Sequence, residues 1–376
     1  RQMCIRDRPS ARPGGTATRP FMMNPLSRQD HLFGALFSDA EVEAMWSSER
    51  FLAVFLEFEK ALAGALAEAG VVTQDVARCA AEDIAGFQVD VGAVTAATLG
   101  DGLPIPELLR QLKAEARPES MPAIHVGATS QDLIDTAFLL ILREANDVFD
   151  ARLGAVLEGF STLEASWGDA AMMGRTRMQA ALPIRVSDRI TAWRSPIGSQ
   201  LEKLRALRPQ MERLQFGGAV GNRSALGKAA SDVATGLARR LALSEPGRAR
   251  HTERGIMAEY AGWLSMVSAS LGKFGQDICL MAQQGGDELE LKGGGSSSAM
   301  PHKQNPVAAE LLVTFASFNA SLLPNMHHAM LHEQERSGAA WTLEWMTLPA
   351  MAVTTGKALL LARDLQAGIC RLGVKT

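Results

Sequence analysis

The chain has 376 residues, enough for two or three substructures around a large core, so a single small domain is not expected. It carries 38 Lys and Arg residues against 41 Asp and Glu residues, and a net charge of -3 excludes a general basic surface for nucleic acid or anionic membranes. The four cysteines are far apart without metal-ligand spacing, which indicates a reducing, cytoplasmic compartment. No uninterrupted apolar run approaches the roughly 18 residues that span a bilayer.

Residues 1–21 are basic, rich in Pro and Gly, and lack the apolar core of a signal peptide. We expect them to be a non-native or disordered leader, with Met22 or Met23 as the natural start. A transit peptide is the alternative, because the segment is rich in Arg and nearly free of acidic residues. Its prolines disfavour the amphipathic helix that a transit peptide needs.

Apolar residues recur at helical spacing in nearly every later segment, and convincing alternating strand patterns are absent. Stripes cover 51–66 and 149–163, and a third, 256–281, is long enough for its helix to cross a whole domain. Between Ser130 and Trp167 there is no proline and there are only two glycines, so an unbroken helix there would span about 55 Å. The sequence therefore predicts an all-α fold.

A second long helix is expected from about Ser187 to Phe216, kinked but not ended by Pro196 and Pro209. Helices of this length with wide apolar faces pack into bundles. The predicted organisation is an N-terminal helical domain at 22–125, a central long-helix bundle at 126–336 and a short C-terminal helical segment at 337–376.

Three polar segments interrupt this apolar scaffold: HVGATSQD at 125–132, GRTRMQAALP at 174–183 and GGGSSSAMPHKQNP at 293–306. Each is expected where a long helix begins, and Asn305 followed by Pro306 reads as an N-cap and first helical residue. Helix N-termini present free N–H groups and partial positive charge, which favour carboxylates.

The same segments supply side chains suited to bind carboxylates. These donors and cations are Thr129, Ser130, Gln131, Arg175, Arg177 and Lys303. Taken alone, each has a simpler explanation: the hydroxyls could only cap a helix, the arginines could be surface charges, and the Gly and Ser run could be only a loop. Their coincidence favours a site for a polyanion.

SSAMPHKQNP resembles the signature of the fumarase/aspartase superfamily, and HVGATSQDLIDTA and GRTRMQAALP are similar to its two other shared segments. The resemblance extends from Asn24 to the end of the chain. It implies an all-α homotetramer with active sites shared between subunits and with neither metal nor organic cofactor. The implied substrate has a carboxylate beside the carbon that gains or loses a proton.

The spacing of the segments supports the shared site independently. The segments at 125–132 and 174–183 flank the predicted long helix, so in one chain they lie at opposite ends. If both serve one site, the second must come from a neighbouring subunit.

By the resemblance, Ser297 moves the proton and Lys303 stabilises the developing charge after the glycine-rich loop closes. His125 matches a catalytic position near the substrate, although it could equally be a hydrogen-bonded core residue. The substrate-binding residues that the resemblance implies are Thr129, Ser130, Gln131, Arg175, Arg177, Gln179, Ser298, Met300, Asn305 and Arg336.

The second segment departs from the superfamily pattern, because most members read GRTH where this chain has Arg177. That histidine helps to protonate a leaving amine or hydroxide. A carboxylate leaves as a stable anion, with a conjugate-acid pKa of about 4, and needs no such acid. The change favours the branch that forms a lactone from the tricarboxylate 3-carboxy-cis,cis-muconate, which residues 334–349, QERSGAAWTLEWMTLP, also resemble.

Two alternatives to this interpretation stay open at this point. An adenylosuccinate-type lyase would release fumarate, and a catalytically silent structural member would resemble the lens proteins derived from argininosuccinate lyase. Intact Ser297, Lys303 and Asn305 disfavour the silent protein. His328 and His332 have metal-like spacing on one expected helix face, but no third ligand follows from the sequence, and no metal is expected.

Overall fold

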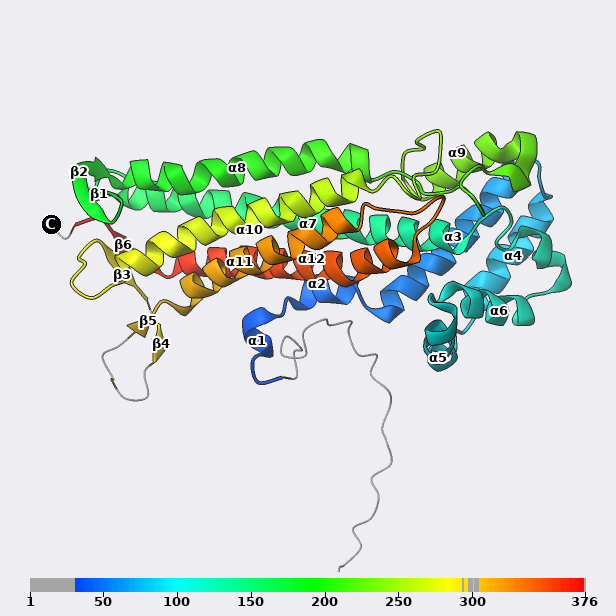
Figure 1. Ribbon diagram of the computed structural model, residues 1–376, viewed down its shortest axis with the longest axis horizontal. Coiled ribbons are helices and arrows are strands. Elements are labelled where there is room, and N and C mark those ends of the chain that lie inside the picture. Colours follow the sequence, from blue (N-terminus) through cyan, green and yellow to red (C-terminus); the bar gives the residue numbers. More distant parts are fainter. Residues whose placement is uncertain (1–30, 293, 297–299, 301–303, 375–376) are drawn as a thin grey trace, which may run out of the picture.

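A computed structural model describes residues 31–292, 294–296, 300 and 304–374, which form an elongated bundle of long helices (Figure 1). The long helices of the bundle are α7 (Ser130–Trp167), α8 (Val186–Met211), α10 (Gly255–Met281), α11 (Val307–His328) and α12 (Gly338–Ala367). Helix α10 packs against α8, α11 and α12, and α7 packs against α8 and α12. The predicted all-α long-helix bundle is confirmed.

Helix α7 sets the length of the molecule. It runs unbroken over 38 residues with the predicted bounds, which corresponds to about 57 Å. Every residue from 131 to 142 is buried, so the first three turns lie inside the protein. The Asp132 carboxylate accepts a hydrogen bond from the backbone N–H of the N-cap residue Thr129 at 2.9 Å, which fixes where the helix starts.

The bundle core is aromatic where α7, α8 and α10 meet. The rings of Phe160 and Trp193 both lie 5.1 Å from the ring of Phe274, and all three side chains are almost fully buried. Helix α8 continues through Pro196 and Pro209, as predicted, but ends at Met211 instead of near residue 216.

Shorter helices build one end of the molecule, at the right of Figure 1. They are α3 (Ser48–Glu68), α4 (Gln74–Gly86), α5 (Val91–Asp101), α6 (Ile105–Glu115) and α9 (Ala230–Arg240), with 3-10 turns at Pro118–Ala123 and Ser224–Ala229. Helices α1 (Gly34–Phe37) and α2 (Ala40–Met45) precede them, and α2 contacts α3, α7 and α12. The predicted domain boundaries, near 125 and 336, fall just before α7 and α12.

The segment after residue 337, expected to be short, consists mainly of the 30-residue α12, which packs within the bundle. The division into domains stays a prediction. The expected leader, 1–21, lies outside the described residues.

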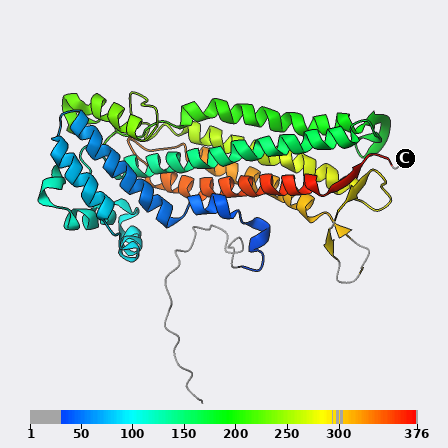
Figure 2. The same cartoon turned by 180° about the vertical axis from the view of Figure 1, so that it is seen from behind.

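Short strands gather at the other end of the molecule (Figures 1 and 2), which corrects the prediction that strands are absent. They pair antiparallel as β1 (Ala171–Thr176) with β2 (Gln179–Arg185), β3 (Leu289–Leu291) with β6 (Ile369–Leu372), and β4 (Gly295–Ser296) with β5 (Gln304–Asn305). Only Met172 is buried in the first pair, so no alternating apolar face marks that hairpin in the sequence.

Helix α11 begins one residue later than predicted. Asn305 belongs to β5, and Pro306 occupies the N-cap position, where it provides no side-chain cap. Among the described helices, α11 alone is long and apolar enough to cross a membrane by length and composition, with a mean hydropathy of 1.4. No uninterrupted apolar run marks this helix in the sequence, because Glu310, Asn319 and Pro324 interrupt it. Asn319 is fully buried and donates a hydrogen bond to Ser268 of α10 at 2.7 Å.

Candidate active site

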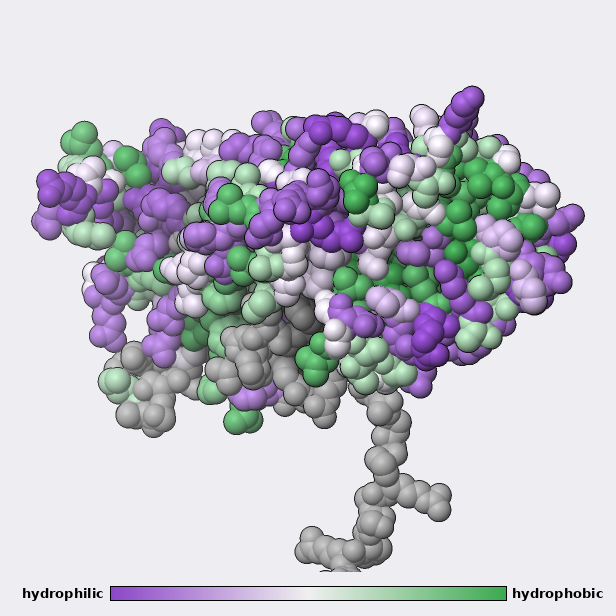
Figure 3. Space-filling model, turned by 45° about the vertical axis from the view of Figure 1, so that its right-hand side comes forward, coloured by the Kyte–Doolittle hydropathy of each residue, from purple (hydrophilic) through white to green (hydrophobic). Residues whose placement is uncertain are grey.

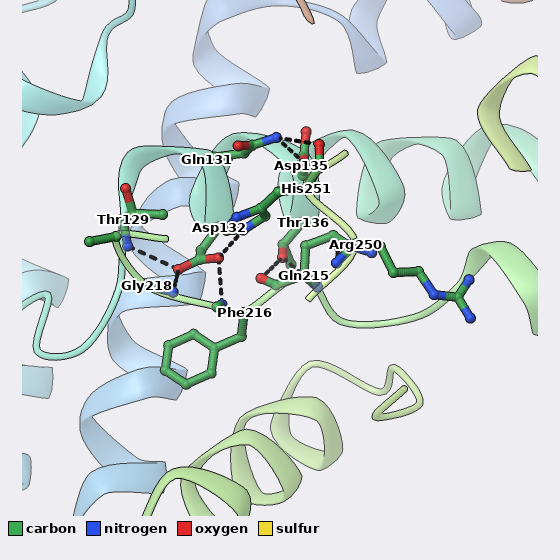
Figure 4. A network of polar contacts seen from close by, with 12 residues as sticks. Thr129, Gln131, Asp132, Asp135, Thr136, Gln215, Phe216, Gly218, Arg250 and His251 are labelled. Atoms are coloured by element: carbon green, nitrogen blue, oxygen red, sulfur yellow. Dashed lines mark hydrogen bonds and ion pairs between the residues drawn. The ribbon is translucent and has the colours of Figure 1, made fainter. Parts of the chain in front are cut away.

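The start of α7 is held by a buried carboxylate (Figure 4). Asp132 accepts hydrogen bonds from the backbone N–H groups of Gly217 at 2.8 Å and Gly218 at 2.9 Å, in addition to that of Thr129. His251 Nε2 lies 2.7 Å from the same carboxylate, and because the carboxylate oxygen accepts, Nε2 carries the hydrogen. Asp132 therefore joins α7 to two loops that are distant in sequence.

Arg336, expected from the resemblance to bind substrate, contacts this helix start. Its guanidinium donates to Gln131 Oε1 at 2.8 Å, to Thr129 Oγ1 at 3.2 Å and to the carbonyl of Ala219 at 3.2 Å. The exposed loop between α11 and α12 is thereby brought against the hydroxyl and amide groups that precede and begin α7. Ser130 is the first helical residue there and is half-buried.

Gln131 has a different position from the one expected of a ligand-binding residue. Its side chain is fully buried, and Nε2 donates to Asp135 at 3.2 Å and to the carbonyl of His251 at 3.0 Å, while Oε1 accepts from Arg336. Because both ends of the amide are already used, Gln131 orients Arg336 and does not present a free donor.

His125 is held by a carboxylate that sequence reasoning missed. Glu59 of α3 is fully buried, and its oxygens lie 2.6 Å from His125 Nδ1 and 2.8 Å from the His125 backbone N–H. Within the described residues, Nε2 of this imidazole makes no hydrogen bond, so its second nitrogen is available. His125 also has a φ of +61°, a left-handed conformation that is uncommon outside glycine and typical of functional sites.

We refer to His125, Thr129, Ser130, Gln131 and Arg336 as the α7 cluster. Only a tertiary contact distinguishes Glu59 from the surface-facing acids of α3, and His251 likewise lies in a loop without a motif of its own. No signal in the sequence singled out either residue.

Arg175, Arg177 and Gln179, here the hairpin cluster, lie on β1–β2 and not on a loop at a helix start, since α8 begins only at Val186. Arg177 and Met178 form the two-residue turn between the paired residues Thr176 and Gln179, with φ of +48° and +68°. Such turns favour Asn-Gly, because two positive φ angles strain other residues. The exposed, strained turn presents Arg177 at the tip.

Arg175 already forms an ion pair within its own chain. Its guanidinium donates to Glu288 at 2.5 Å, and the buried Glu288 also accepts from the backbone N–H of Met173 at 2.5 Å. This pair fixes the hairpin against the loop that follows α10. Gly174 lies beside the pair, where a Cβ would come within 2.8 Å of the Leu182 carbonyl oxygen, so the hairpin requires glycine there.

A polar cavity of about 550 Å³ lies between the hairpin, α8, α10 and the loop 283–288. Its charged lining comprises Arg175, Arg177, Arg189, Lys273, Asp277 and Glu288. A second cavity, of about 340 Å³, lies between α3, α5, α7 and α12 and has no charged side chain in its lining. Figure 3 shows hydrophobic residues gathered toward that end of the molecule. The polar cavity suits an anion and the apolar one does not.

The third polar segment is closed at its base by the pairing of Gly295 with Asn305. Its catalytic candidates, Ser297 and Lys303, and the binding candidate Ser298 lie outside the described residues. Met300 is exposed. The β4–β5 pair lies at the same end of the bundle as the hairpin (Figure 1), whereas the α7 cluster lies at the opposite end of α7, a helix of about 57 Å.

The histidine pair suspected of metal spacing does not share a helix face. Helix α11 ends at His328, and His332 lies in the following loop, where burial lowers its pKa. Within the described part of the chain, no three His, Cys, Asp or Glu side chains gather in a way that could hold a metal ion.

A family model described as lyase matches residues 27–320. The chain belongs to this lyase family. The 3-carboxy-cis,cis-muconate cycloisomerase of Pseudomonas putida is 36% identical over 346 residues, which cover 90% of this chain and 82% of that protein. Membership makes the chain an enzyme of the fumarase/aspartase superfamily, as the three polar segments predicted.

Solved structures of lyase-family enzymes have the same fold. The crystal structure of 3-carboxy-cis,cis-muconate lactonizing enzyme from Pseudomonas putida matches with a TM-score of 0.85 at 35% identity, over 90% of this chain and 77% of that one. Fumarate lyase from Mesorhizobium sp. BNC1 matches with a TM-score of 0.83 at 30% identity, over 90% of this chain and 76% of that one.

Proposed function

We propose that this lyase-family enzyme catalyses the cycloisomerisation of 3-carboxy-cis,cis-muconate to a carboxymuconolactone in protocatechuate (β-ketoadipate) catabolism. One carboxylate of the substrate adds to the substrate's own double bond, and the resulting carbanion takes up a proton. The similarity to the Pseudomonas putida cycloisomerase and lactonizing enzyme supports this reaction.

The observation that carries the proposal is Arg177 at the tip of the hairpin, lining a cavity rich in cations. A guanidinium stays protonated and cannot give a proton to a leaving amine or hydroxide. It can hold a carboxylate through two parallel hydrogen bonds. A reaction in which a carboxylate is the nucleophile, or in reverse the leaving group, needs a group that holds the carboxylate. It does not need an acid that protonates a leaving group.

In this reaction Ser297 delivers the proton, because the residue that acts as base in the eliminating direction acts as acid in reverse. Lys303 and Asn305 stabilise the charge that develops on the carboxylate beside the carbanion. Arg175, Arg177 and Arg336 hold the carboxylates of the substrate, and His125 lies beside it.

The α7 cluster and the hairpin cluster serve one site only if they come from different copies of the chain. Their separation along α7 supports a homotetramer with shared active sites, as the resemblance implies. A cytoplasmic location fits Cys79, Cys279 and Cys370, which are free thiols.

The test is an ultraviolet assay that follows loss of the conjugated diene absorbance of 3-carboxy-cis,cis-muconate on addition of the purified protein. Lactone formation, verified by mass and by the loss of one alkene signal, is the expected result. Adenylosuccinate is the matched control substrate. Release of fumarate from adenylosuccinate without turnover of the muconate would refute the proposal.

A further inference from the structure

The polar cavity beside the hairpin has more positive than negative charge. Four cations line it against two carboxylates, Asp277 and Glu288. Asp277 is 8% exposed, and it accepts from Lys273 Nζ at 2.5 Å and from the indole N–H of Trp193 at 2.8 Å. Glu288 forms an ion pair with Arg175. Both carboxylates are therefore occupied by partners inside the protein.

Arg177 and Arg189 are the remaining two cations. Within the described part of the chain, neither forms an ion pair, and Arg189 only contacts the weakly accepting sulfur of Met281, at 3.9 Å. Arg189 is half-buried in the first turn of α8, where the helix dipole opposes a positive charge. Its placement there leaves a cation uncompensated unless an anion binds.

We propose that Arg177 and Arg189 each bind one carboxylate of a polycarboxylate ligand, and that Arg189 makes the site specific for ligands with at least two carboxylates. Two excess positive charges match a dianion, whereas a monoanion leaves one of them unneutralised. Both guanidiniums can bind a carboxylate through two hydrogen bonds. Arg189 lies outside the superfamily segment 174–183, so no motif assigned it. The inference rests on the proposed function only for the identity of the substrate.

The test measures binding of citrate, a tricarboxylate that cannot lactonise in this way, to the intact protein by titration calorimetry at low ionic strength. We expect Arg189→Met to weaken citrate binding at least about tenfold, the loss of one charge-assisted pair. Arg189→Lys keeps the positive charge but loses the two parallel hydrogen bonds of a guanidinium. Its citrate affinity should lie between those of Arg189→Met and the unmodified protein. The control is Arg185→Met, since Arg185 is exposed and pairs with Asp169 at 2.7 Å outside the cavity; its citrate affinity should match that of the unmodified protein.

Thermal melts establish that each variant is folded before titration. If Arg189→Met does not fold, Arg189→Lys is the variant whose citrate affinity is compared. Unchanged citrate affinity in a folded Arg189 variant, or acetate binding as tightly as citrate, would overturn the inference. Kinetics separate it from the proposed function. If Arg189→Met turns over muconate with an unchanged KM, only the inference about Arg189 is refuted. If citrate binding depends on Arg189 but the protein does not turn over muconate, only the proposed function is refuted.

Discussion

Arg254→Met tests whether the buried charge cluster beneath the α7 cluster supports the site. Arg254 is 7% exposed and donates to Asp135 at 2.8 Å and to Glu344 at 2.5 Å. Asp135 also accepts from Gln131 at 3.2 Å and from the indole of Trp341 at 2.8 Å. Removal of the cation leaves two buried carboxylates facing each other and loosens the partner of Gln131.

The free-energy cost follows from burial. Removing one partner of a buried ion pair costs about 3 to 5 kcal/mol, because the remaining charge is left uncompensated. Two carboxylates share Arg254 here, so we expect the free energy of unfolding to fall by at least the lower figure. Arg205→Met removes an exposed partner of Asp150 and should change stability little.

The loss of stability caused by Arg254→Met should also depend on pH. Burial raises the pKa of Glu344, and Arg254 opposes that shift. Without Arg254 the pKa in the folded state rises further above the unfolded value of about 4.5. A folded-state pKa above the unfolded one means that stability is greatest below about pH 4.5 and falls as pH rises through the folded value. The destabilisation of Arg254→Met should therefore be larger at pH 8 than at pH 5.

Urea unfolding of the variant and the unmodified protein at both pH values measures this difference. Adding Glu344→Gln to Arg254→Met should recover part of the loss, because the amide carries no charge. A pH-independent cost, or a loss no larger than that of Arg205→Met, would refute the reasoning. The charge cluster would then contribute little to the support of the α7 cluster.

Ser297→Ala should lower muconate turnover by about a hundredfold or more while the circular dichroism stays unchanged, and near-normal turnover would remove Ser297 from the mechanism. Co-expression of Ser297→Ala with an inactive Arg175→Met chain should restore part of the activity through hybrid sites; no recovery in a verified hybrid oligomer would indicate that each chain carries a complete site. Glu59→Gln should lower kcat more than it raises KM and should alter the pH profile of kcat, because His125 loses its fixed orientation. A uniform loss of folded protein with an unaltered profile would make Glu59 merely structural.

The long helices could be predicted because local rules decide them. The run between Ser130 and Trp167 lacks proline, so its bounds follow from the Thr129 cap and from continuous apolar periodicity. The prolines of α8 leave the helix unbroken because its buried face, which includes Trp193, holds it in place through packing. The hairpin was not predictable from periodicity, since its strands bury only Met172.

The candidate site likewise contains residues that the sequence predicts and residues that it does not. Its motif residues could be named from the sequence, because each lies in a short contiguous segment. The residues that orient them could not: Glu59 belongs to an ordinary amphipathic helix, and Arg189 to the first turn of another. Their roles arise from contacts and cavities that only the packed structure defines.

Helix α7 links the fold to the proposed chemistry. It is a rigid rod of about 57 Å, buried over its first three turns, so it holds the α7 cluster and the hairpin cluster near its opposite ends. The proposed shared site requires two copies that pack antiparallel along this rod, with the start of one α7 beside the hairpin of the other. On the proposed shared site, Arg336 of one copy and Arg177 and Arg189 of its partner would together supply three cations for a tricarboxylate. In that arrangement, assembly and substrate specificity depend on the same helix length.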